Sequence, residues 1–592
     1  MFCHPGFPEP AFLPLQSSFF LLSRTELKGF NSSTAPNTPT VMDGYAQSAP
    51  LSSWKECFLL KWIRMLIPVG FKSEVLELSK LAVPVILSNF LGFAVSFIST
   101  VFCGHLGKTE LAGVALAIAV INVTGISIGF GLASACDTLV SQTYGSGNLM
   151  RVGVIMQRAI LILLLACFPC WAILINTEPI LLAVRQEPDV ARMSQMYVKI
   201  FMPALPAAFM YSLEARFLQN QGIIWPQVIT GVVVNLLNAL INYIVIYILH
   251  MGVAGSALAN TISQFSMAGI LYTYIMVKGL HKATWGGWSK ECLQDWGSYV
   301  RLAVPGMVML CAEWWTYEIG SFLAGIISEV ELGAQSVVYE LSNIAYMFPL
   351  GFSIAGSVRV GNALGAGDTQ QAKLSAKLSM LCAVSVSVCL SILIGSLKDH
   401  IAYVFTYDEQ IRQRVADVIS FYAPFILLDA TSASSGGVIR GAGKQRVGAI
   451  CYFLGYYGVG LPIGVSLMFA AKMGIKGLWT GLFTCASLQC TFLIFYLIRL
   501  NWRKVTVEAQ IRAGVHKSTT DDGPQPGEQE DSEGPTDTLD LVEGAEEPDV
   551  KTATVQLPYR TVILRRGLAL ASMLFILAVG IILNLIVTNL VT

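Results

Sequence analysis

Long apolar stretches, each able to cross a lipid bilayer as a helix, constrain this chain more than any other feature of its sequence. A membrane-spanning helix needs roughly 20 predominantly apolar residues. Only 13% of the residues are charged, against about 25% in a soluble globular protein. We therefore expect an all-α polytopic membrane protein. Its predicted spans lie at about 81–104, 112–136, 152–175, 197–218, 225–249, 253–276, 300–323, 332–357, 375–397, 415–438, 446–470, 475–498 and 567–590.

The first six spans and the next six are two copies of one unit. Four short segments of the first half recur in the second half, displaced by 220 to 222 residues. Because each copy has an even number of spans, both copies share one orientation and the symmetry axis runs along the membrane normal. We expect two pseudo-symmetric six-helix lobes, arranged as parallel repeats around a central cavity, plus a thirteenth C-terminal transmembrane helix. The matching segments are LAVP at 81–84 and 302–305, ELAG at 110–113 and ELGA at 331–334, YGSGN at 144–148 and LGAGD at 364–368, and MGVAG at 251–255 and MGIKG at 473–477.

A polar, acidic segment separates the twelfth span from the thirteenth. Residues 520–550 combine acidic residues with Pro and Gly and have too few apolar groups to offset the entropy of ordering. We predict a disordered linker there. The predicted divisions are a cytoplasmic, partly disordered N-terminal segment (1–75), a first lobe (76–280), a cytoplasmic loop between the lobes (281–299), a second lobe (300–503), a cytoplasmic acidic linker (504–560) and the thirteenth span (561–592).

The distribution of basic residues predicts the orientation of the chain. Lys and Arg accumulate in the short cytoplasmic loops of membrane proteins. The side that carries Lys55, Lys61 and Arg64 also carries the basic residues within 278–290 and 440–446, whereas the opposite side has few. We expect a cytoplasmic N-terminus and an extracellular C-terminus.

Four carboxylates lie inside predicted spans of the second lobe, namely Glu313, Glu318, Glu340 and Asp429. A charged carboxylate at the bilayer centre costs roughly 2.5–3.5 kcal/mol, so such a group usually faces a cavity or a partner. A carboxylate in that position can take up a proton from one side and release it when a cation arrives. These residues predict proton/cation exchange. The alternative is a structural carboxyl group, capped by hydroxyl or amide neighbours.

The four acids are not expected to act alike. Glu318 lies five residues after Glu313, about 140° around the helix, so the two cannot face the same narrow site. We expect Glu313, Glu340 and Asp429 to share protons as one titrating group. For Glu318, a functional role and a role in helix packing both remain open.

Aromatic residues accompany these acids along the same spans. Tyr339 and Tyr346 are seven residues apart and therefore share a helix face, while Trp314 and Tyr317 flank the acids of the preceding span. Aromatic faces attract organic cations, each contact contributing about 0.5–2 kcal/mol. Aromatic residues also pack membrane helices or anchor them at the interface. Their proximity to acids favours the cation-binding interpretation.

The first lobe has polar residues at membrane depth. We interpret Asn89 and Asn122 as groups that line the cavity or hold helices together. Asp137 lies near the predicted cytoplasmic end of its span. It either has a functional role or serves as a cap or as an ion-pair partner of Arg359 in the other lobe.

Composition and motifs exclude several other functions. Lys and Arg together number 38, as do Asp and Glu, so no basic excess favours nucleic-acid binding. The cysteines show neither a disulfide framework nor zinc-ligand spacing, and we predict no metal or cofactor. The Gly-rich segments 145–147 and 361–368 lack the Gly-Lys-Ser/Thr ending of a phosphate loop. They occur at equivalent points of both repeats, as helix-ending turns do. A gradient, not ATP, is therefore the expected energy source.

The chain resembles the multidrug and toxin extrusion (MATE) family, specifically its animal organic-cation exchangers. The resemblance covers about residues 75–503, and a thirteenth span is typical of the vertebrate members. The motifs that carry it are VFCGHLG at 101–107, CDTL at 136–139 with Ser141-Gln142, EWW at 313–315, VGNALGAGD at 360–368 and GGVIRG at 436–441.

This resemblance implies a proton/organic-cation antiporter in the apical plasma membrane of excretory epithelia, which we expect to be a monomer. Tetraethylammonium, metformin, cimetidine and creatinine are the kinds of substrate it implies. Two positions depart from the family pattern: Asp429 stands where close mammalian relatives have Glu, and Asn89 where some have Gln, which leaves the substrate range open. The implied roles are essential acids for Glu313, Glu318, Glu340 and Asp429, cavity lining for Trp314, Tyr317, Tyr339, Tyr346, Asn89 and Asn122, and thiol sensitivity for Cys103 and Cys167.

Two other functions remain as alternatives. A flippase for lipid-linked precursors belongs to the same broad superfamily, but it needs a basic cavity for a diphosphate, whereas the predicted cavity is acidic. A receptor or scaffold without flux is the second alternative. The duplicated spans and the central acids argue against it.

Overall fold

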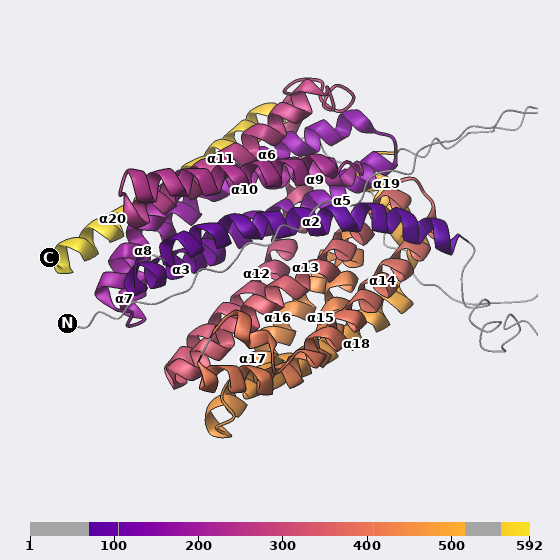
Figure 1. Cartoon of the computed structure of the whole chain (residues 1–592). Coiled ribbons are helices and arrows are strands. Elements are labelled where there is room, and N and C mark those ends of the chain that lie inside the picture. The colour runs from indigo at the N-terminus through magenta and orange to yellow at the C-terminus, as the bar shows by residue number, and fades with distance from the viewer. Residues whose placement is uncertain (1–69, 105, 407, 516–557, 592) are drawn as a thin grey trace, which may run out of the picture. The chain divides into compact units, whose positions relative to one another are not determined.

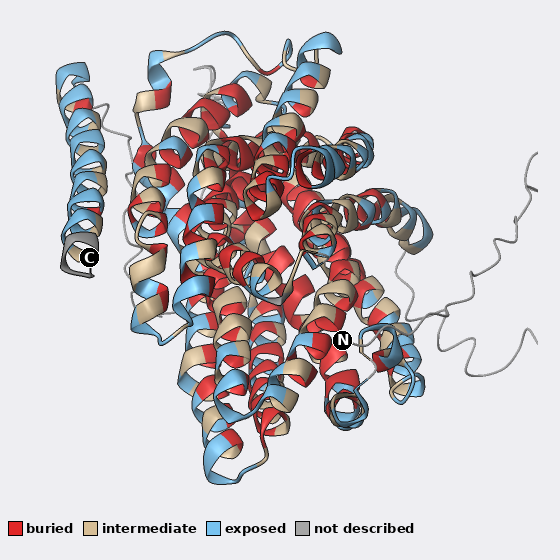
Figure 2. Cartoon of the chain, turned by 60° about the vertical axis from the view of Figure 1, so that its left-hand side comes forward, coloured by how far each residue is buried: buried red, intermediate tan, exposed pale blue. Residues whose placement is uncertain are grey.

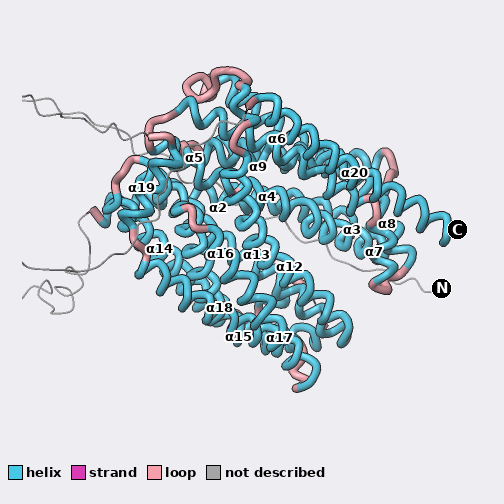
Figure 3. The backbone as a smooth tube through the Cα atoms, turned by 180° about the vertical axis from the view of Figure 1, so that it is seen from behind, coloured by secondary structure: helices cyan, strands magenta, loops and turns pink. Residues whose placement is uncertain are grey.

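The computed structural model describes residues 70–104, 106–406, 408–515 and 558–591, and every regular element in these ranges is a helix (Figure 3). Eleven helical stretches of the described ranges are long and apolar enough to cross a membrane. The helices α11 (Gly252–Val277) and α12 (Trp296–Ile327) are also long enough, with 26 and 32 residues, but carry more polar side chains. The predicted all-α, multi-pass architecture is confirmed.

The first half of the chain contributes six long helical stretches, some of them broken by short π or 3₁₀ segments. In Figure 1 they form one group, coloured indigo to magenta. The elements are α2 (Phe71–Gly104), α3 (Lys108–Ile121), η2 (Asn122–Ile126), α4 (Ser127–Ala133), α5 (Ala135–Gly145), α6 (Leu149–Leu174), α7 (Thr177–Ala183), α8 (Pro188–Phe201), η3 (Met202–Ala204), α9 (Leu205–Asn220), α10 (Trp225–Tyr243), η4 (Ile244–Ile248) and α11.

The second half repeats this plan after the short helix η5 (Lys290–Leu293). Its helices form the second group of Figure 1, and α20 packs beside α6 of the first group. The elements are α12, α13 (Glu329–Gly365), α14 (Thr369–Ser396), η6 (Ile401–Val404), α15 (Glu409–Ala442), α16 (Gln445–Phe453), η7 (Leu454–Gly460), α17 (Leu461–Val465), η8 (Ser466–Ala470), α18 (Ile475–Arg499), α19 (Trp502–Ala513) and α20 (Tyr559–Val591).

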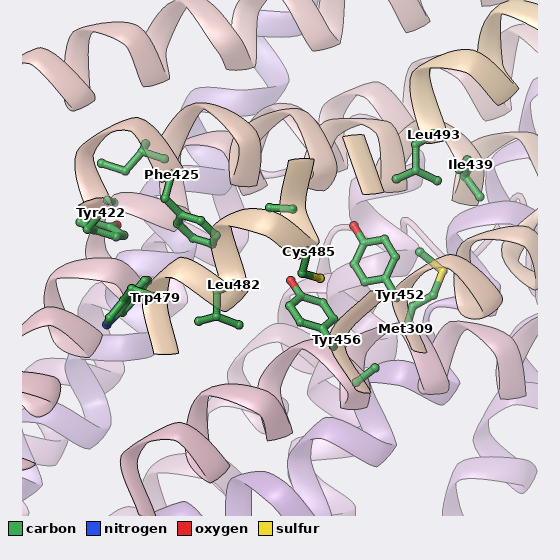
Figure 4. Close-up of a cluster of buried hydrophobic side chains, with 14 of the residues drawn as sticks. Met309, Tyr422, Phe425, Ile439, Tyr452, Tyr456, Trp479, Leu482, Cys485 and Leu493 are labelled. Carbon is green, nitrogen blue, oxygen red and sulfur yellow. The ribbon is translucent and has the colours of Figure 1, made fainter. Parts of the chain in front are cut away.

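Each lobe has its own apolar core. The core of the second lobe surrounds Trp479 of α18, whose ring packs edge-on against Tyr422 and Phe425 of α15 (Figure 4). The core of the first lobe contains Tyr197 and Phe209. In contrast, α20 is mostly exposed (Figure 2), as expected for a helix with a face toward lipid.

Two equivalent helices, α2 and α12, pass from one lobe to the other. The N-terminal half of α2 packs against α13 and α14 of the second lobe through Leu78, Ala82 and Ile86. Its C-terminal half returns to the first lobe, where Val95 contacts Val234 of α10. The LAVP repeat ends at a proline inside each of these helices, Pro84 in α2 and Pro305 in α12. A proline removes one helix hydrogen bond and favours a bend.

The crossing of α12 mirrors that of α2. Its first half contributes Tyr299 and Ala303 to the core of the first lobe, and its second half contributes Ala312 and Ala324 to the core of the second. Glu313 therefore lies near the point at which α12 changes lobes.

Some predicted boundaries need correction. The linker was predicted to start at residue 504, but residues 502–513 form α19. Asn501 caps this helix by accepting from the Lys504 amide, and Val505 and Ala509 bury one face of it. At the other end of the chain, α2 starts at Phe71, inside the predicted N-terminal segment. Residues 1–69 of that segment and 516–557 of the predicted linker lie outside the described residues.

Candidate functional site

Glu313 of α12 and Asp429 of α15 form a buried pair of carboxyl groups. Both are less than a tenth exposed. The Tyr346 side chain lies near the Glu313 carboxyl group, and Asp429 lies within electrostatic range of Glu313. Two like charges this close in a buried site resist simultaneous ionisation, so the pair favours holding one proton or one cation.

The residues beside Glu313 touch the other lobe. Cys311 contacts Ser127 of α4 with a sulfur–oxygen distance of 3.6 Å. Trp315 donates from its indole nitrogen to the carbonyl oxygen of Val123, at 3.0 Å. This segment of α12 therefore contacts both lobes. Cys311 and Trp315 contact the first lobe, and Glu313 faces the second lobe.

Glu318 and Glu340 form a second pair. The Tyr339 hydroxyl donates to Glu318 Oε1 at 3.1 Å, and Glu340 of α13 lies within electrostatic range of Glu318. The sequence predicted Glu340 to share protons with Glu313 and Asp429, but the fold places it beside Glu318.

In the described part of the chain, no three His, Cys, Asp or Glu side chains are grouped closely enough to hold a metal ion.

We expect Tyr339→Phe to raise the KM for a transported cation about ten- to 100-fold, because one hydrogen bond to a charged carboxylate contributes about 1.5–3 kcal/mol. The matched control is Tyr272→Phe, on an exposed position of α11. Initial rates of labelled tetraethylammonium uptake measure both variants. Equal KM values for Tyr339→Phe and wild type would contradict a role for this hydrogen bond.

Tyrosines connect the two acid pairs. The ring of Tyr317 stacks on Tyr339, with centroids 5.9 Å apart, and its hydroxyl lies within electrostatic range of both Glu313 and Asp429. Sequence reasoning missed Tyr452 of α16 and Tyr456 of η7, which are drawn in Figure 4. Both also lie within electrostatic range of Glu313. Their spacing of four residues places both on one helix face, which was the available signal.

The other residues predicted to line the cavity have fewer contacts with the acids. Trp314 is half-buried, and so are Asn89 and Asn122 of the first lobe. Asn122 starts the π segment η2, and π segments often occur at functional sites. The side-chain nitrogen of Asn89 is buried without a hydrogen-bond partner. In the described residues, neither asparagine hydrogen-bonds to any of the four acids.

The two cysteines that the family resemblance implies to be thiol-sensitive are buried in this structure. Cys103 of α2 lies next to Ser256, and the Cys167 thiol of α6 donates to the carbonyl oxygen of Leu163 at 3.5 Å. Both side chains are at most 1% exposed. A thiol reagent therefore needs another conformation to reach them.

The lobes meet where α5 and α13 cross at their C-terminal ends. A Cβ atom on Gly145 would lie 2.1 Å from the carbonyl oxygen of Asn362, and one on Gly365 would lie 1.9 Å from that of Gln142. Only glycine allows such an approach. Gly147 and Gly367 then turn the chain with φ of 79° and 85°, as predicted for helix-ending turns.

Hydrogen bonds from α5 to α15 add to the contact between α5 and α13. We call this whole contact between the lobes the seam. Thr138 donates to the carbonyl oxygen of Arg440 at 2.5 Å, and the Gln142 side-chain amide donates to that of Gly441 at 2.8 Å. The seam comprises Thr138, Gln142 and Gly145 of α5, Asn362 and Gly365 of α13, and Arg440 and Gly441 of α15.

Helix α19 covers the seam and contacts both lobes. Its Glu508 forms an ion pair with Lys444 of the second lobe at 2.7 Å. Its Arg512 donates to Gln142 of the first lobe at 2.9 Å. Burial lowers the pKa of the Arg512 guanidinium, and the nearby Glu508 carboxylate opposes this effect.

A second contact between the lobes replaces an ion pair that the sequence suggested. Arg359 does not pair with Asp137; it pairs with Glu74 of α2, which also accepts from Gln371 and Ser375 of α14. Asp137 instead pairs with Arg216 of α9 at 2.5 Å, within its own lobe. The ion-pair partners of Arg359 and Asp137 come from other helices, so their identity depends on how the helices pack and not on sequence spacing.

We expect Glu74→Gln to weaken the closed arrangement of the lobes by about 1.5–3 kcal/mol, because it removes a charged hydrogen-bond acceptor from Arg359. Glu77→Gln is the matched control, since the ion pair of Glu77 is with Lys80 at the surface, where a pair contributes about 0.2–1 kcal/mol. The apparent melting temperature in detergent should fall clearly for Glu74→Gln alone. Equal shifts of the melting temperature in the two variants would contradict the role of Glu74 in holding the lobes together.

Comparisons with known proteins show the family of this chain. A family model described as MatE matches residues 84–244 and 305–466, so the family unit occurs once in each lobe. Multidrug and toxin extrusion protein 1 of Danio rerio is 62% identical over 544 residues, which cover 88% of this chain and 92% of the relative. The Homo sapiens protein of that name is 51% identical over 561 residues, which cover 91% of this chain and 98% of that relative. A crystal structure of the eukaryotic MATE transporter AtDTX14 has a TM-score of 0.73 at 28% identity and covers 75% of this chain and 100% of that one.

The two-lobe helical fold and the buried acids, together with these similarities, define a multi-pass membrane transporter. The chain belongs to the multidrug and toxin extrusion (MATE) family.

Proposed function

We propose that this transporter exports organic cations, drugs and toxins in exchange for external protons, by alternating access. The observation that carries the proposal is the pair Glu313–Asp429, two buried carboxyl groups surrounded by tyrosines. A proton and an organic cation compete for the negative charge of this pair, and such competition is the basis of antiport. The names of the relatives, which refer to multidrug and toxin extrusion, support the export of such compounds.

The crossing of α12 offers a way for binding to move the lobes. Glu313 faces the second lobe, while Cys311 and Trp315 on either side of it contact the first. A change in the charge of Glu313 therefore acts on a helix that both lobes hold. Because such an interface has discrete arrangements, the ligand selects one of two states.

We assign the present arrangement to the state closed on the cytoplasmic side. The seam lies at the ends of helices that the distribution of Lys and Arg predicts to be cytoplasmic. In this state the acids exchange protons with the outside, and opening of the seam then exposes them to cytoplasmic cations. The same orientation gives a cytoplasmic N-terminus and an extracellular C-terminus.

The proposed substrates are permanently or partly charged organic cations such as tetraethylammonium, metformin, cimetidine and creatinine. We propose the apical plasma membrane of excretory epithelium as the location and the monomer as the working unit. The acidic site does not suit the diphosphate of a lipid-linked precursor.

Uptake of labelled tetraethylammonium into reconstituted vesicles tests the proposal. One pH unit supplies about 1.4 kcal/mol per proton. With the vesicle interior one unit more acidic than the bath, a one-for-one exchange should accumulate the cation about tenfold. Vesicles without protein are the control. Uptake that is equal with and without the pH gradient would contradict the proposal.

A further inference from the structure

Helix α19 is rooted in the second lobe. Only two residues separate its start from the end of α18. Val505 and Ala509 belong to the apolar core of the second lobe, and Trp502 packs against that core. The hydroxyl groups of Thr506 and of Thr369, at the start of α14, are 2.7 Å apart. The first two turns of α19, which we call its root, are therefore part of the second lobe.

The C-terminal turn of α19, which we call its tip, is held by the first lobe instead. The Arg512 guanidinium donates to Gln142 Oε1 of α5 at 2.9 Å. The side-chain amide of Asn148, in the turn that joins α5 to α6, donates to the carbonyl oxygen of Ala513 at 3.2 Å. The helix thus lies across the seam, with its root in one lobe and its tip on the other.

The side chain of Gln142 is the point at which α5, α15 and α19 meet. It accepts from Arg512 and donates to the carbonyl oxygen of Gly441 at 2.8 Å. Arg512 lies over Gly443, where a Cβ would be 1.9 Å from Nη1. Gly443 ends α15, and the negative end of the helix dipole favours a cation there. Arg512 therefore holds the first lobe only while Gln142 stays against the end of α15.

Separation of the lobes at the seam would break the tip contacts and leave the root intact. Gln142 and Asn148 would move away with the first lobe, whereas Val505 and Ala509 would stay in the core of the second. A hydrogen bond of a charged group changes an equilibrium by about ten- to 100-fold. The tip contacts are thus strong enough to favour the closed state and weak enough to break in each cycle.

We propose that α19 is a latch on the cytoplasmic closure of the transporter. Its root stays with the second lobe throughout the cycle, and its tip binds the first lobe only in the closed state. Arg512 is the positioning residue of this latch: it sets the ratio of the closed to the open state and does not contact the substrate. This inference rests on the proposed function, because it assumes alternating access and a cytoplasmic seam.

Hydrogen–deuterium exchange of the purified, full-length protein tests the latch without substrate or gradient. Arg512→Gln should make the amide hydrogens of 138–147 exchange about tenfold faster, because the closed state loses a charged hydrogen bond. The amides of 505–510 should keep their wild-type rates, since the root remains packed. Unchanged exchange in 138–147 would overturn the inference. So would faster exchange in 505–510, which would show that the root depends on the first lobe.

Arg503→Gln is the matched control, because it makes the same substitution at an exposed position of the same helix. It should exchange like wild type. Asn148→Ala removes the other tip contact from the side of the first lobe and should speed exchange in 138–147 about two- to tenfold, as expected for a neutral hydrogen bond. It also tests the latch if Arg512→Gln does not fold. Wild-type exchange in Asn148→Ala, or fast exchange in Arg503→Gln, would contradict the latch.

The sidedness of transport separates a latch from a merely structural role. The KM for labelled tetraethylammonium is measured at each face, in inside-out and right-side-out membrane vesicles. A smaller closed population lowers the cytoplasmic KM relative to the outer KM, so the ratio of outer to cytoplasmic KM should rise about tenfold in Arg512→Gln. A structural defect would leave this ratio unchanged, and that result would overturn the inference. Because the ratio does not depend on proton coupling, its rise supports the latch even if wild-type uptake ignores the gradient.

Discussion

Glu313→Gln should reduce proton-driven uptake of tetraethylammonium at least about 100-fold, which corresponds to about 2.7 kcal/mol. Glutamine keeps the size of the side chain, but it carries neither a charge nor a titrating proton. Both the attraction for the cation and the coupling to protons should fail. The measurement is the initial uptake rate in vesicles with an acidic interior.

The conservative variant Glu313→Asp is the control for this loss. It keeps the carboxylate and shortens it by one methylene, so part of the coupled uptake should survive. A Glu313→Gln protein that bound the cation weakly but kept proton-coupled uptake at saturating concentration would reduce Glu313 to a binding residue. The account would then lose its coupling site.

Gly365→Ala should force the closed seam apart. The added Cβ would lie 1.9 Å from the carbonyl oxygen of Gln142, and both atoms belong to backbone segments that cannot rotate away. Overpacking of this kind costs about 1–3 kcal/mol. We expect the closed state to lose population and the amide hydrogens of 138–147 and 358–368 to exchange at least about tenfold faster with deuterium.

The matched control for the seam is Gly269→Ala on α11, where a Cβ would have no neighbour within 4 Å. Its exchange and transport should equal those of wild type. Unchanged exchange in Gly365→Ala would show that the crossing of α5 and α13 does not hold the lobes together.

The fold could be predicted from the sequence to a large extent, because apolar length is a strong signal and the duplication repeats it. All the predicted spans are helical, and the LAVP repeat marks the two helices that cross between lobes. Helix α19 was missed. With only 12 residues and a narrow face of small residues such as Ala509, it has no feature that distinguishes it from the start of a polar linker.

The site was predicted only in part. Helix geometry correctly separated Glu318 from Glu313, because it concerns a single helix. The packing of the helices decides which acid of another helix lies near Glu313 and which lies near Glu318. The placement of Glu340 beside Glu318 could therefore not be foreseen. The same holds for the partners of Arg359 and Asp137, which come from α2 and α9.

Proton flow driven by a cation gradient alone tests the central claim most directly. Vesicles containing the protein, tetraethylammonium and a trapped pH-sensitive dye are diluted into cation-free medium of the same pH, with the membrane potential clamped. Exchange at the acid pair predicts that the lumen acidifies as the cation leaves, and that Glu313→Gln abolishes this change. Exit of the cation without any change in the pH of the lumen would contradict the account.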